Sequence, residues 1–425
     1  MQSRSGAGQP AGILIVDDTP ANLQVLAGML KDRGYKVRPV PSGKLALVAA
    51  RRDPPDLILL DINMPEMNGY EVCEHLKADD KLRGVPVIFI SALTEQLDKV
   101  KAFATGGVDY ITKPFQMEEL HARVETHLKL RRLQIELEET NARLANANGR
   151  MSRDLKAAAK IQATFLPRET PNVAGADFAW IYQPCDELAG DGLSIIPLGD
   201  GKVGLYILDV SGHGVASALL SVTLCRLLSP PGEPSSILMG DGDTRDRRDV
   251  TPPALIAARL NRLFPFDTST EQFATMVYGI LNVATGEFRY VSAGHPGPVH
   301  LPGGGDPVIL ESQGFPIGVA DDAFEERSVR LGAGDRLYLY SDGVSEAMDP
   351  ARKQFGDARL LETIGQSRSE PLQASVATLL GEIGRWHGSQ SFQDDISILA
   401  VEISTASAQG EPGATGLVRP RANTE

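Results

Sequence analysis

The sequence is poor in cysteine, in long apolar runs and in positive charge. Its 425 residues include only 3 cysteines (Cys73, Cys185 and Cys225), with no CxxC pair, which excludes a disulfide scaffold or a zinc site built from cysteines. The longest apolar runs, such as LILL and VIFI, have the length of strands and are too short to cross a bilayer. The polar N-terminus, MQSRSGAGQPAG, lacks the apolar core of a signal peptide. We therefore expect a cytoplasmic protein with no membrane partner.

The charge balance argues against a nucleic acid as partner. The chain has 42 Lys and Arg against 55 Asp and Glu, a formal net charge of -13, and no basic run that would follow a phosphate backbone. Apolar residues make up 42% and charged residues 23%, as in ordinary globular proteins. At roughly 100–200 residues per domain, a chain of this length is expected to form two or three domains.

Composition and periodicity divide the chain into segments. In the first part, apolar runs of strand length alternate with amphipathic stretches of helix length, which predicts an α/β domain whose parallel sheet is covered on both faces. A proline-free, charged segment follows, and then a region rich in strand patterns. The predicted parts are a flexible N-terminus (1–11), an α/β domain (12–130), a helical linker (117–160), a second globular domain (165–403) and a disordered tail (404–425).

The linker segment carries an incomplete heptad pattern. Leu130, Leu137, Leu144 and Met151 are seven residues apart, whereas polar residues such as Thr140 weaken the companion row. The pattern predicts one long helix. It is either the coiled-coil seam of a homodimer or a solvated spacer that packs on its own domains.

Polar residues follow successive predicted strands of the first domain. Asp17 and Asp18 follow the first strand, and Asp61, Ser91 and Lys113 follow the third, fourth and fifth. Ligands of open α/β sheets bind outside the carboxyl ends of the strands, so these side chains are expected to meet at one edge. Clustered carboxylates repel one another unless a cation lies between them, which predicts Mg²⁺ and leaves the lysine to balance a phosphoryl group.

The segments ILIVDD, LLDINMPEMNGYE, FISA and DYITKPF closely resemble the receiver domain of bacterial response regulators. A helix cap would explain one of these aspartates, but not matching positions in successive motifs. The resemblance implies a flavodoxin-like, doubly wound fold, bound Mg²⁺, and a sensor histidine kinase or phosphotransfer protein as partner. The implied roles are phosphoacceptor for Asp61, Mg²⁺ partners for Asp17, Asp18 and the Asn63 carbonyl, phosphoryl contacts for Ser91 and Lys113, and aromatic switch for Tyr110.

Aspartates beside glycine recur at strand ends of the second domain. They are Asp191 in AGDG, Asp209 in LDVSGHG, Asp342 in YSDG, and Asp394 and Asp395 in QDDISILAV. A neighbouring glycine lets the backbone approach a ligand closely. Ligation by carboxylates alone suits Mg²⁺ or Mn²⁺, and several clusters from distant segments predict a two-metal centre for phosphoryl displacement.

The segments KIQATFLP, DVSGHGVASALLS, FATMVYGIL, SAGHPGP, SDGVSEA and DDISIL resemble, in this order, the PP2C phosphatases of the SpoIIE/RsbU type. The resemblance implies an αββα sandwich with two Mn²⁺ or Mg²⁺ ions, and a serine/threonine protein phosphatase acting on a phosphorylated anti-sigma-factor antagonist. It also implies that Asp209 bridges both ions with help from the Val210 carbonyl, that Asp342 and Asp394 complete one shell with Asp395 adjacent, and that Asp191 anchors the rim.

One position departs from the family's pattern. Many members carry a second carboxylate three residues after the first aspartate, where this chain has Ser194. This leaves open a catalytically impaired module that binds and sequesters its partner under phosphorylation control. His213, in SGHG, is a candidate general acid or a loop-shaping residue, and His295, in AGHPG, is expected to be structural.

Overall fold

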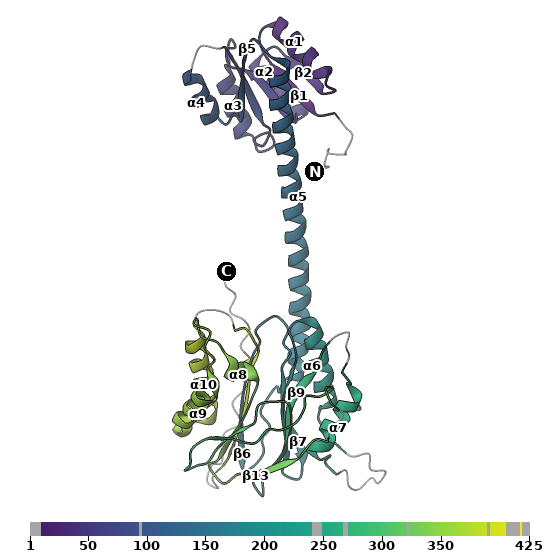
Figure 1. Ribbon diagram of the computed structural model, residues 1–425, viewed down its shortest axis with the longest axis vertical. Coiled ribbons are helices and arrows are strands. Elements are labelled where there is room, and N and C mark those ends of the chain that lie inside the picture. The colour runs from purple at the N-terminus through teal and green to yellow at the C-terminus, as the bar shows by residue number, and fades with distance from the viewer. Residues whose placement is uncertain are drawn as a thin grey trace. The chain divides into compact units, whose positions relative to one another are not determined.

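The computed structural model of the protein describes residues 10–92, 96–239, 249–266, 271–320, 323–388, 392–404 and 417–418. The chain divides into two compact units, Met1–Gly149 and Arg150–Glu425 (Figure 1). The predicted flexible N-terminus and disordered tail lie mostly outside the described residues, apart from strand β16 (Leu417–Val418). Among the described residues, none of the helices combines the length and the apolar character needed to cross a membrane.

The first unit is a parallel sheet of five strands in the order β2-β1-β3-β4-β5. The strands are β1 (Gly12–Val16), β2 (Lys36–Val40), β3 (Leu57–Asp61), β4 (Val87–Ala92) and β5 (Asp109–Lys113). The helices are α1 (Pro20–Lys31), α2 (Gly43–Arg52), α3 (Gly69–Ala78), α4 (Gln96–Ala104) and α5 (Met117–Gln162). Strands β1 and β3 are apolar and buried on both faces, as their uninterrupted apolar runs predict.

Helices cover both faces of this sheet. One apolar cluster joins α1 and the first turns of α5 to the sheet, and a second joins α2, α3 and α4 to the opposite face (Figure 1). The predicted doubly wound architecture is therefore confirmed. Three of the polar residues that were predicted to follow their strands lie within them instead. Asp61 and Lys113 are the last residues of β3 and β5, and Ser91 lies inside β4.

Helix α5 has 46 residues and confirms the predicted long helix. Leu120, Val124 and Leu128 on its first turns are buried in the first unit. Further along, Leu137 and Leu144 of the heptad row are 60% and 57% exposed in the single chain. The apolar row is thus free to pack against a partner helix.

The second unit consists of two sheets that pack face to face. The first has the order β13-β10-β9-β8-β7, and the second has the order β12-β11-β14-β15-β6-β16. The strands of the first sheet are β7 (Gly192–Gly199), β8 (Lys202–Val210), β9 (Ala274–Asn282), β10 (Glu287–Ala293) and β13 (Arg327–Arg330). The other strands of the second sheet are β6 (Ala176–Gln183), β11 (Val299–Leu301), β12 (Val308–Ile309), β14 (Arg336–Tyr340) and β15 (Ile396–Ile403).

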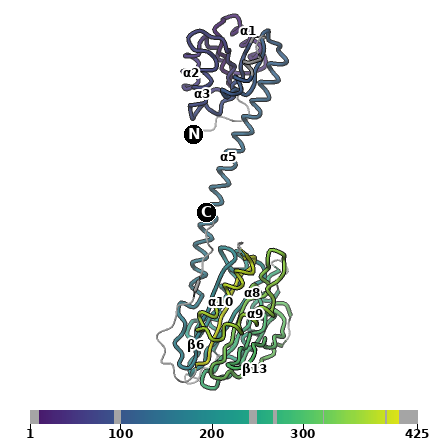
Figure 2. The backbone as a smooth tube through the Cα atoms, turned by 90° about the vertical axis from the view of Figure 1, so that its left-hand side faces the viewer, coloured from purple at the N-terminus to yellow at the C-terminus, as the bar shows by residue number. Residues whose placement is uncertain are grey.

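Helices cover the outer face of each sheet. They are α6 (Val215–Leu227) and α7 (Pro253–Leu263) on the first sheet, and α8 (Asp342–Glu346), α9 (Gly356–Gln366) and α10 (Leu372–His387) on the second. A third apolar cluster fills the space between the sheets. Figures 1 and 2 show α9 and α10 side by side along the second sheet. These four layers are the predicted αββα sandwich.

Candidate functional site

The carboxyl edge of the first unit's sheet brings together the acidic residues predicted there. Asp17, just past β1, is fully buried, and Asp61, at the end of β3, is 5% exposed. The Lys113 ammonium, at the end of β5, lies 2.9 Å from Asp17 Oδ2 and 2.9 Å from Asp61 Oδ1. Three distant segments thus meet at one edge, as parallel topology requires.

Helix α3 begins against Asp61. A capping box fixes its start: the Asn68 side chain accepts a hydrogen bond from the Glu71 amide, and the Glu71 carboxylate accepts one from the Asn68 amide. The next residue, Gly69, is so close to β3 that a Cβ atom there would lie 2.3 Å from the Asp61 carbonyl oxygen. Glycine is therefore required where α3 begins against the end of β3.

The electrostatics of this edge favour a divalent cation. Burial raises the pKa of Asp61; the Lys113 ammonium opposes this shift, and the charges of Asp17 and Asp18 add to it. Burial lowers the pKa of Lys113, but its hydrogen bonds to Asp61 and Asp17 outweigh burial and the net shift is upward. Ligand oxygens of Asp17, Asp18 and Asp61 lie within 4.8 Å of one another. This all-oxygen set fits Mg²⁺.

The remaining residues predicted for this edge differ in their exposure. Ser91 is buried, Asn63 is exposed, and Tyr110 is half-buried. The Tyr110 ring makes an edge contact with Phe103, with ring centroids 6.3 Å apart, and Arg123 lies 5.7 Å from its centroid. Their roles toward a phosphoryl group and as a switch remain predictions.

In the second unit, the predicted aspartates come from four separate segments. Asp209 lies near the end of β8, Asp342 begins α8, Asp394 and Asp395 precede β15, and Asp191 precedes β7. Asp209 shares its side of the strand with Leu205 and Ile207, which pack between the sheets. The carboxylates of Asp342, Asp394 and Asp395 all act on the pKa of Asp209, so the segments converge electrostatically.

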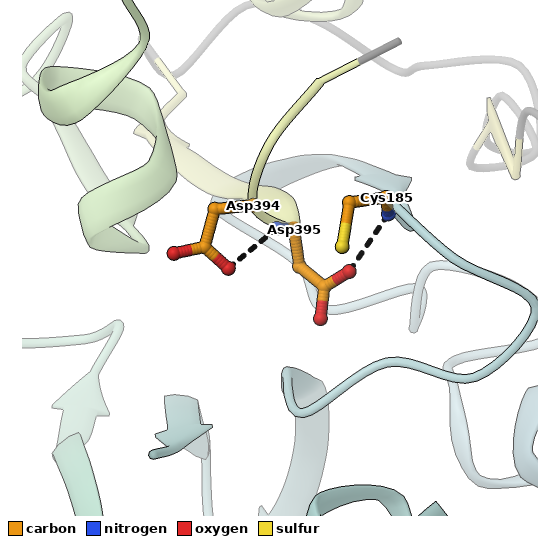
Figure 3. A group of neighbouring side chains, drawn as sticks. All are labelled: Cys185, Asp394 and Asp395. Atoms are coloured by element: carbon orange, nitrogen blue, oxygen red, sulfur yellow. Dashed lines mark hydrogen bonds between the residues drawn. The ribbon is translucent and has the colours of Figure 1, made fainter. Parts of the chain in front are cut away.

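The Asp395 carboxylate is hydrogen-bonded to backbone amides of the loop before β7. Its Oδ1 accepts a hydrogen bond from the Cys185 amide at 2.8 Å (Figure 3). Its Oδ2 accepts one from the Gly190 amide at 2.8 Å. Asp394 is exposed beside it, and its Oδ1 accepts a hydrogen bond from the Asp395 amide at 2.8 Å (Figure 3). The two neighbours therefore differ in role: the Asp395 carboxylate holds the loop before β7, and the Asp394 carboxylate is open to a ligand.

Asp191 lies deep in the site and not at its rim. It is 2% exposed, and its backbone carbonyl accepts hydrogen bonds from the Ser221 hydroxyl on α6 and the Tyr182 hydroxyl on β6. Among the described residues, its side-chain Oδ2 atom is buried without a hydrogen-bond partner. A buried carboxylate oxygen without a donor is costly unless a cation or a proton satisfies it.

Two glycines allow these segments to touch. A Cβ atom on Gly190 would lie 2.7 Å from the Val210 carbonyl oxygen, and one on Gly343 would lie 2.1 Å from the Asp395 carbonyl oxygen. The glycine beside Asp191 thus rests on the carbonyl that follows Asp209, and the glycine after Asp342 rests on Asp395. The AGDG and YSDG motifs have glycine there because no side chain fits.

Crowding of carboxylates raises their pKa values. Burial, and then the charges of Asp342, Asp394 and Asp395, raise the pKa of Asp209 to about 8. Burial, with the charges of Asp394 and Glu346, raises the pKa of Asp342 to about 6. Burial also raises the pKa values of Asp191 and Asp395. The set cannot carry all its negative charges unless cations bind, so it fits the predicted Mn²⁺ or Mg²⁺ ions.

Metal affinity in the second unit should therefore rise with pH between about 6 and 8. Protons on Asp342 and Asp209 compete with the metal below their raised pKa values, and binding releases them. By the same linkage, the metal-free fold should lose stability as the pH rises toward 8, since its carboxyls hold protons more tightly than the unfolded chain does. Calorimetric Mn²⁺ titrations in buffers of different ionisation heat measure the released protons. A pH-independent affinity without proton release would contradict this assignment.

Ser194 does not occupy a vacant place in the cluster. It pairs with Tyr206 across β7 and β8, and Tyr206 packs in the apolar cluster under α6 and α7. Directly paired residues of antiparallel strands project to the same face, so Ser194 faces the helices, whereas Asp209 faces the space between the sheets. A carboxylate at position 194 would point away from Asp209, so the serine gives no reason to expect an impaired site.

Sequence reasoning missed two residues at this site. The Gln162 amide, at the end of α5, donates to the Ala189 carbonyl at 2.7 Å and accepts from the Ala189 amide at 3.2 Å, two residues before Asp191. The Cys185 sulfur and the Asp394 and Asp395 carboxylates lie within 4.8 Å of one another (Figure 3). No sequence periodicity connects residue 162 or 185 with the aspartates, so only the fold reveals them.

The two candidate histidines differ in their exposure to solvent. His213 is on the surface, 79% exposed, with Nδ1 3.8 Å from Asp186 Oδ2, so its place beside the Asp209 loop is consistent with either predicted role. His295 is 3% exposed and bonded through both ring nitrogens, as a structural residue would be.

Comparison with protein families agrees with both units. Residues 13–125 match the family model of the response regulator receiver domain, and residues 199–404 match that of stage II sporulation protein E (SpoIIE). The chain thus contains a receiver domain and a SpoIIE PP2C-type domain, which confirms both resemblances seen in the sequence.

Individual relatives cover parts of the chain. The DNA-binding response regulator MtrA of Mycolicibacterium smegmatis is 41% identical over 117 residues, which are 28% of this chain and 50% of that protein. Protein IcfG of Synechocystis is 29% identical over 267 residues, which are 58% of this chain and 41% of that protein. The chain thus spans half or less of the length of these relatives. The SiaA-PP2C domain of Pseudomonas aeruginosa, 18% identical with a TM-score of 0.51, covers 61% of this chain and 99% of its own, and shows the fold.

Proposed function

We propose that the protein is a response regulator in which phosphorylation of Asp61 controls a metal-dependent serine/threonine protein phosphatase. The observation that carries this proposal is the convergence of two separate carboxylate sets, one with Lys113 at the receiver edge and one around Asp209. Each set fits divalent cations, and each belongs to a domain whose family has the corresponding chemistry.

In the receiver, the chain's own residues would accept and hold a phosphoryl group. The Asp61 carboxylate is the nucleophile, and its oxygen lies 2.9 Å from the Lys113 ammonium, which would neutralise charge on the product. Asp17 and Asp18 would hold the Mg²⁺ ion, which supplies further neutralisation of phosphoryl charge when bound. A sensor histidine kinase or phosphotransfer protein would supply the phosphoryl group.

In the phosphatase domain, Asp209, Asp342, Asp394 and Asp191 would hold two Mn²⁺ or Mg²⁺ ions, with the Val210 carbonyl as a further donor. When bound, such ions supply Lewis acidity for in-line hydrolysis of a phosphate ester. Asp395 holds the loop that carries Asp191 through backbone amides. His213, exposed and four residues after Asp209, would donate a proton to the leaving serine or threonine hydroxyl.

The substrate we propose is a phosphorylated anti-sigma-factor antagonist. The support is the SpoIIE-type domain together with the resemblance of the motifs to the SpoIIE/RsbU branch. The deciding experiment incubates the purified full chain with such a phosphoprotein, with Mn²⁺, Mg²⁺ or EDTA. Metal-dependent phosphate release is expected. Tight binding of the phosphoprotein without release under any metal would instead support the sequestering alternative.

We also propose that α5 transmits the receiver's state through a homodimer. Changing Leu137 and Leu144 to Asp should reduce the oligomer, measured by light scattering, and abolish the effect of acetyl phosphate on turnover, because buried charges break a coiled-coil seam. Labelling of Asp61 should persist.

The control for this test adds the same charge elsewhere on the helix, with Ala142→Asp and Ala145→Asp on the face away from the heptad row. This control should keep both the oligomer and the response. If the Leu137 and Leu144 double variant also keeps them, α5 does not act as a dimer seam.

A further inference from the structure

A buried histidine lies between the two sheets of the phosphatase domain, at the end where the aspartates gather. The His295 side chain follows β10 and is 3% exposed. Its Nδ1 atom lies 2.7 Å from the Thr275 hydroxyl on β9, and its Nε2 atom lies 3.0 Å from the Tyr340 carbonyl oxygen at the end of β14. Strand β9 belongs to the first sheet and β14 to the second, so one imidazole joins the two sheets.

Both ends of this connection lie next to proposed metal ligands. Thr275 is the direct pairing partner of Asp209 across β9 and β8. Tyr340 is followed by Ser341, whose hydroxyl bonds to the Asp395 carbonyl at 3.2 Å, and then by Asp342. The connection from Thr275 through His295 to Tyr340 thus joins the strand paired with Asp209 to the strand that leads to Asp342.

The chemistry fixes the direction of the two hydrogen bonds. A carbonyl oxygen only accepts, so Nε2 carries a proton and donates to Tyr340. Burial lowers the pKa of His295 to about 4, so near neutral pH Nδ1 is unprotonated and accepts from the Thr275 hydroxyl. The backbone is held as well, because the His295 carbonyl accepts hydrogen bonds from the Ser292 and Ser312 hydroxyls. Both ring nitrogens and the carbonyl of His295 are thus hydrogen-bonded, which fixes one tautomer of the ring.

We propose that His295 is a positioning residue, a strut that sets the distance between the Asp209 and Asp342 carboxylates and thereby the affinity of the metal centre. The proposal rests on the proposed function only in taking these aspartates as metal ligands. Metal shells tolerate ligand displacements of about 0.2 Å, and loss of an outer partner typically lowers metal affinity by about 10- to 100-fold. His295 itself touches neither metal nor substrate.

The test measures Mn²⁺ binding by calorimetry on the full chain, with turnover in parallel. All proteins carry Asp18→Asn to weaken Mn²⁺ binding at the receiver. Thr275→Val removes the hydroxyl but keeps the side-chain shape, and it should raise the Mn²⁺ dissociation constant about tenfold. Thr275→Ser keeps the hydroxyl and should restore the parent value. His295→Leu should weaken binding at least as much, and adding Thr275→Val to it should cause little further loss, because both substitutions break the same connection.

The matched control is His300→Leu. His300, on β11, is also largely buried, and its Nε2 lies 2.9 Å from Asp335 Oδ2, just before the start of β14. His300 therefore forms its hydrogen bond just before the start of β14, whereas His295 forms its hydrogen bond at the end of the same strand. This control should leave Mn²⁺ affinity unchanged, even where it lowers the unfolding temperature in EDTA.

The outcomes distinguish the proposed positioning role of His295 from the proposed phosphatase activity. Weaker Mn²⁺ binding in Thr275→Val, restored in Thr275→Ser, supports the strut even if the parent hydrolyses no phosphoprotein. Unchanged affinity in Thr275→Val with normal turnover overturns the strut and leaves the enzyme standing. Equal effects of His295→Leu and His300→Leu on affinity overturn it as well. A parent that binds neither Mn²⁺ nor Mg²⁺ overturns both proposals. The Thr275 pair decides the matter if His295→Leu does not fold.

Discussion

Asp209→Asn is expected to lower metal-dependent phosphate release at least about a hundredfold. The pKa of the Asp209 carboxylate is raised by burial and then by the charges of Asp342, Asp394 and Asp395 nearby. An amide keeps the shape but removes the charge that holds a cation, so ions would bind weakly and the transition state would lose their stabilisation. Asp342→Asn should act in the same direction. Initial rates over a range of Mn²⁺ concentrations measure the effect.

The control for this prediction is Asp177→Asn. Asp177 is exposed on β6 and pairs with Glu402, near the end of β15 far from Asp395. The substitution removes a carboxylate from the same domain without touching the cluster, so activity should stay within about twofold of the parent. Activity that is indifferent to Asp209→Asn, or that survives EDTA, would rule out a metal centre on these carboxylates.

The acidic cluster at the receiver edge was predictable because the topology of a parallel sheet largely determines where its residues lie. In a parallel α/β sheet, the residues at the carboxyl ends of neighbouring strands must meet, so Asp17, Asp61 and Lys113 could be brought together from strand positions alone. The structure adds the 2.9 Å contacts and moves Asp61 and Lys113 into the last residue of their strands. The roles of Asn63 and Tyr110 depend on a phosphorylated state and stay predictions.

The phosphatase centre was predictable only in part. Glycine beside aspartate marked the right segments, since Gly190 and Gly343 each touch the neighbouring segment through backbone. The resemblance already separated Asp394, as a metal ligand, from the adjacent Asp395, but residue type and spacing do not show that the Asp395 carboxylate is bonded to the Cys185 and Gly190 amides. It also suggests a missing ligand at Ser194, which strand alternation turns to the opposite face.

Contacts between a side chain and the backbone of a distant segment were beyond sequence reasoning. Gln162 reaches Ala189 and His295 reaches Tyr340 because two sheets and a long helix pack in one particular way. Such pairs leave no periodicity in the sequence. Ala189 and Tyr340 each lie two residues before a proposed metal ligand, so displacements of these contacts would reach the ligands directly.

Asp61→Asn should abolish incorporation of phosphate from acetyl phosphate or from a kinase. The reaction requires a carboxylate oxygen as nucleophile, and an amide forms no acyl phosphate. The site is otherwise built to hold the product, with Lys113 Nζ 2.9 Å from Asp61 Oδ1 and Asp17 and Asp18 within reach of a shared cation. Asp61→Asn should also remove any response of phosphatase turnover to acetyl phosphate. Radiolabelling and the change of intact mass on phosphorylation measure the first effect.

The control for this variant lies just before the same strand. Asp56 immediately precedes β3, at the end opposite Asp61, and its Oδ2 accepts a hydrogen bond from the Gly12 amide at 2.6 Å. Asp56→Asn disturbs an aspartate contact of the receiver but leaves the Lys113 edge intact, so it should label like the parent. If Asp61→Asn labels equally well, the phosphoacceptor lies elsewhere. If it fails to label but turnover still responds to acetyl phosphate, the receiver is phosphorylated without controlling the phosphatase, because the only difference between the two proteins is the nucleophile.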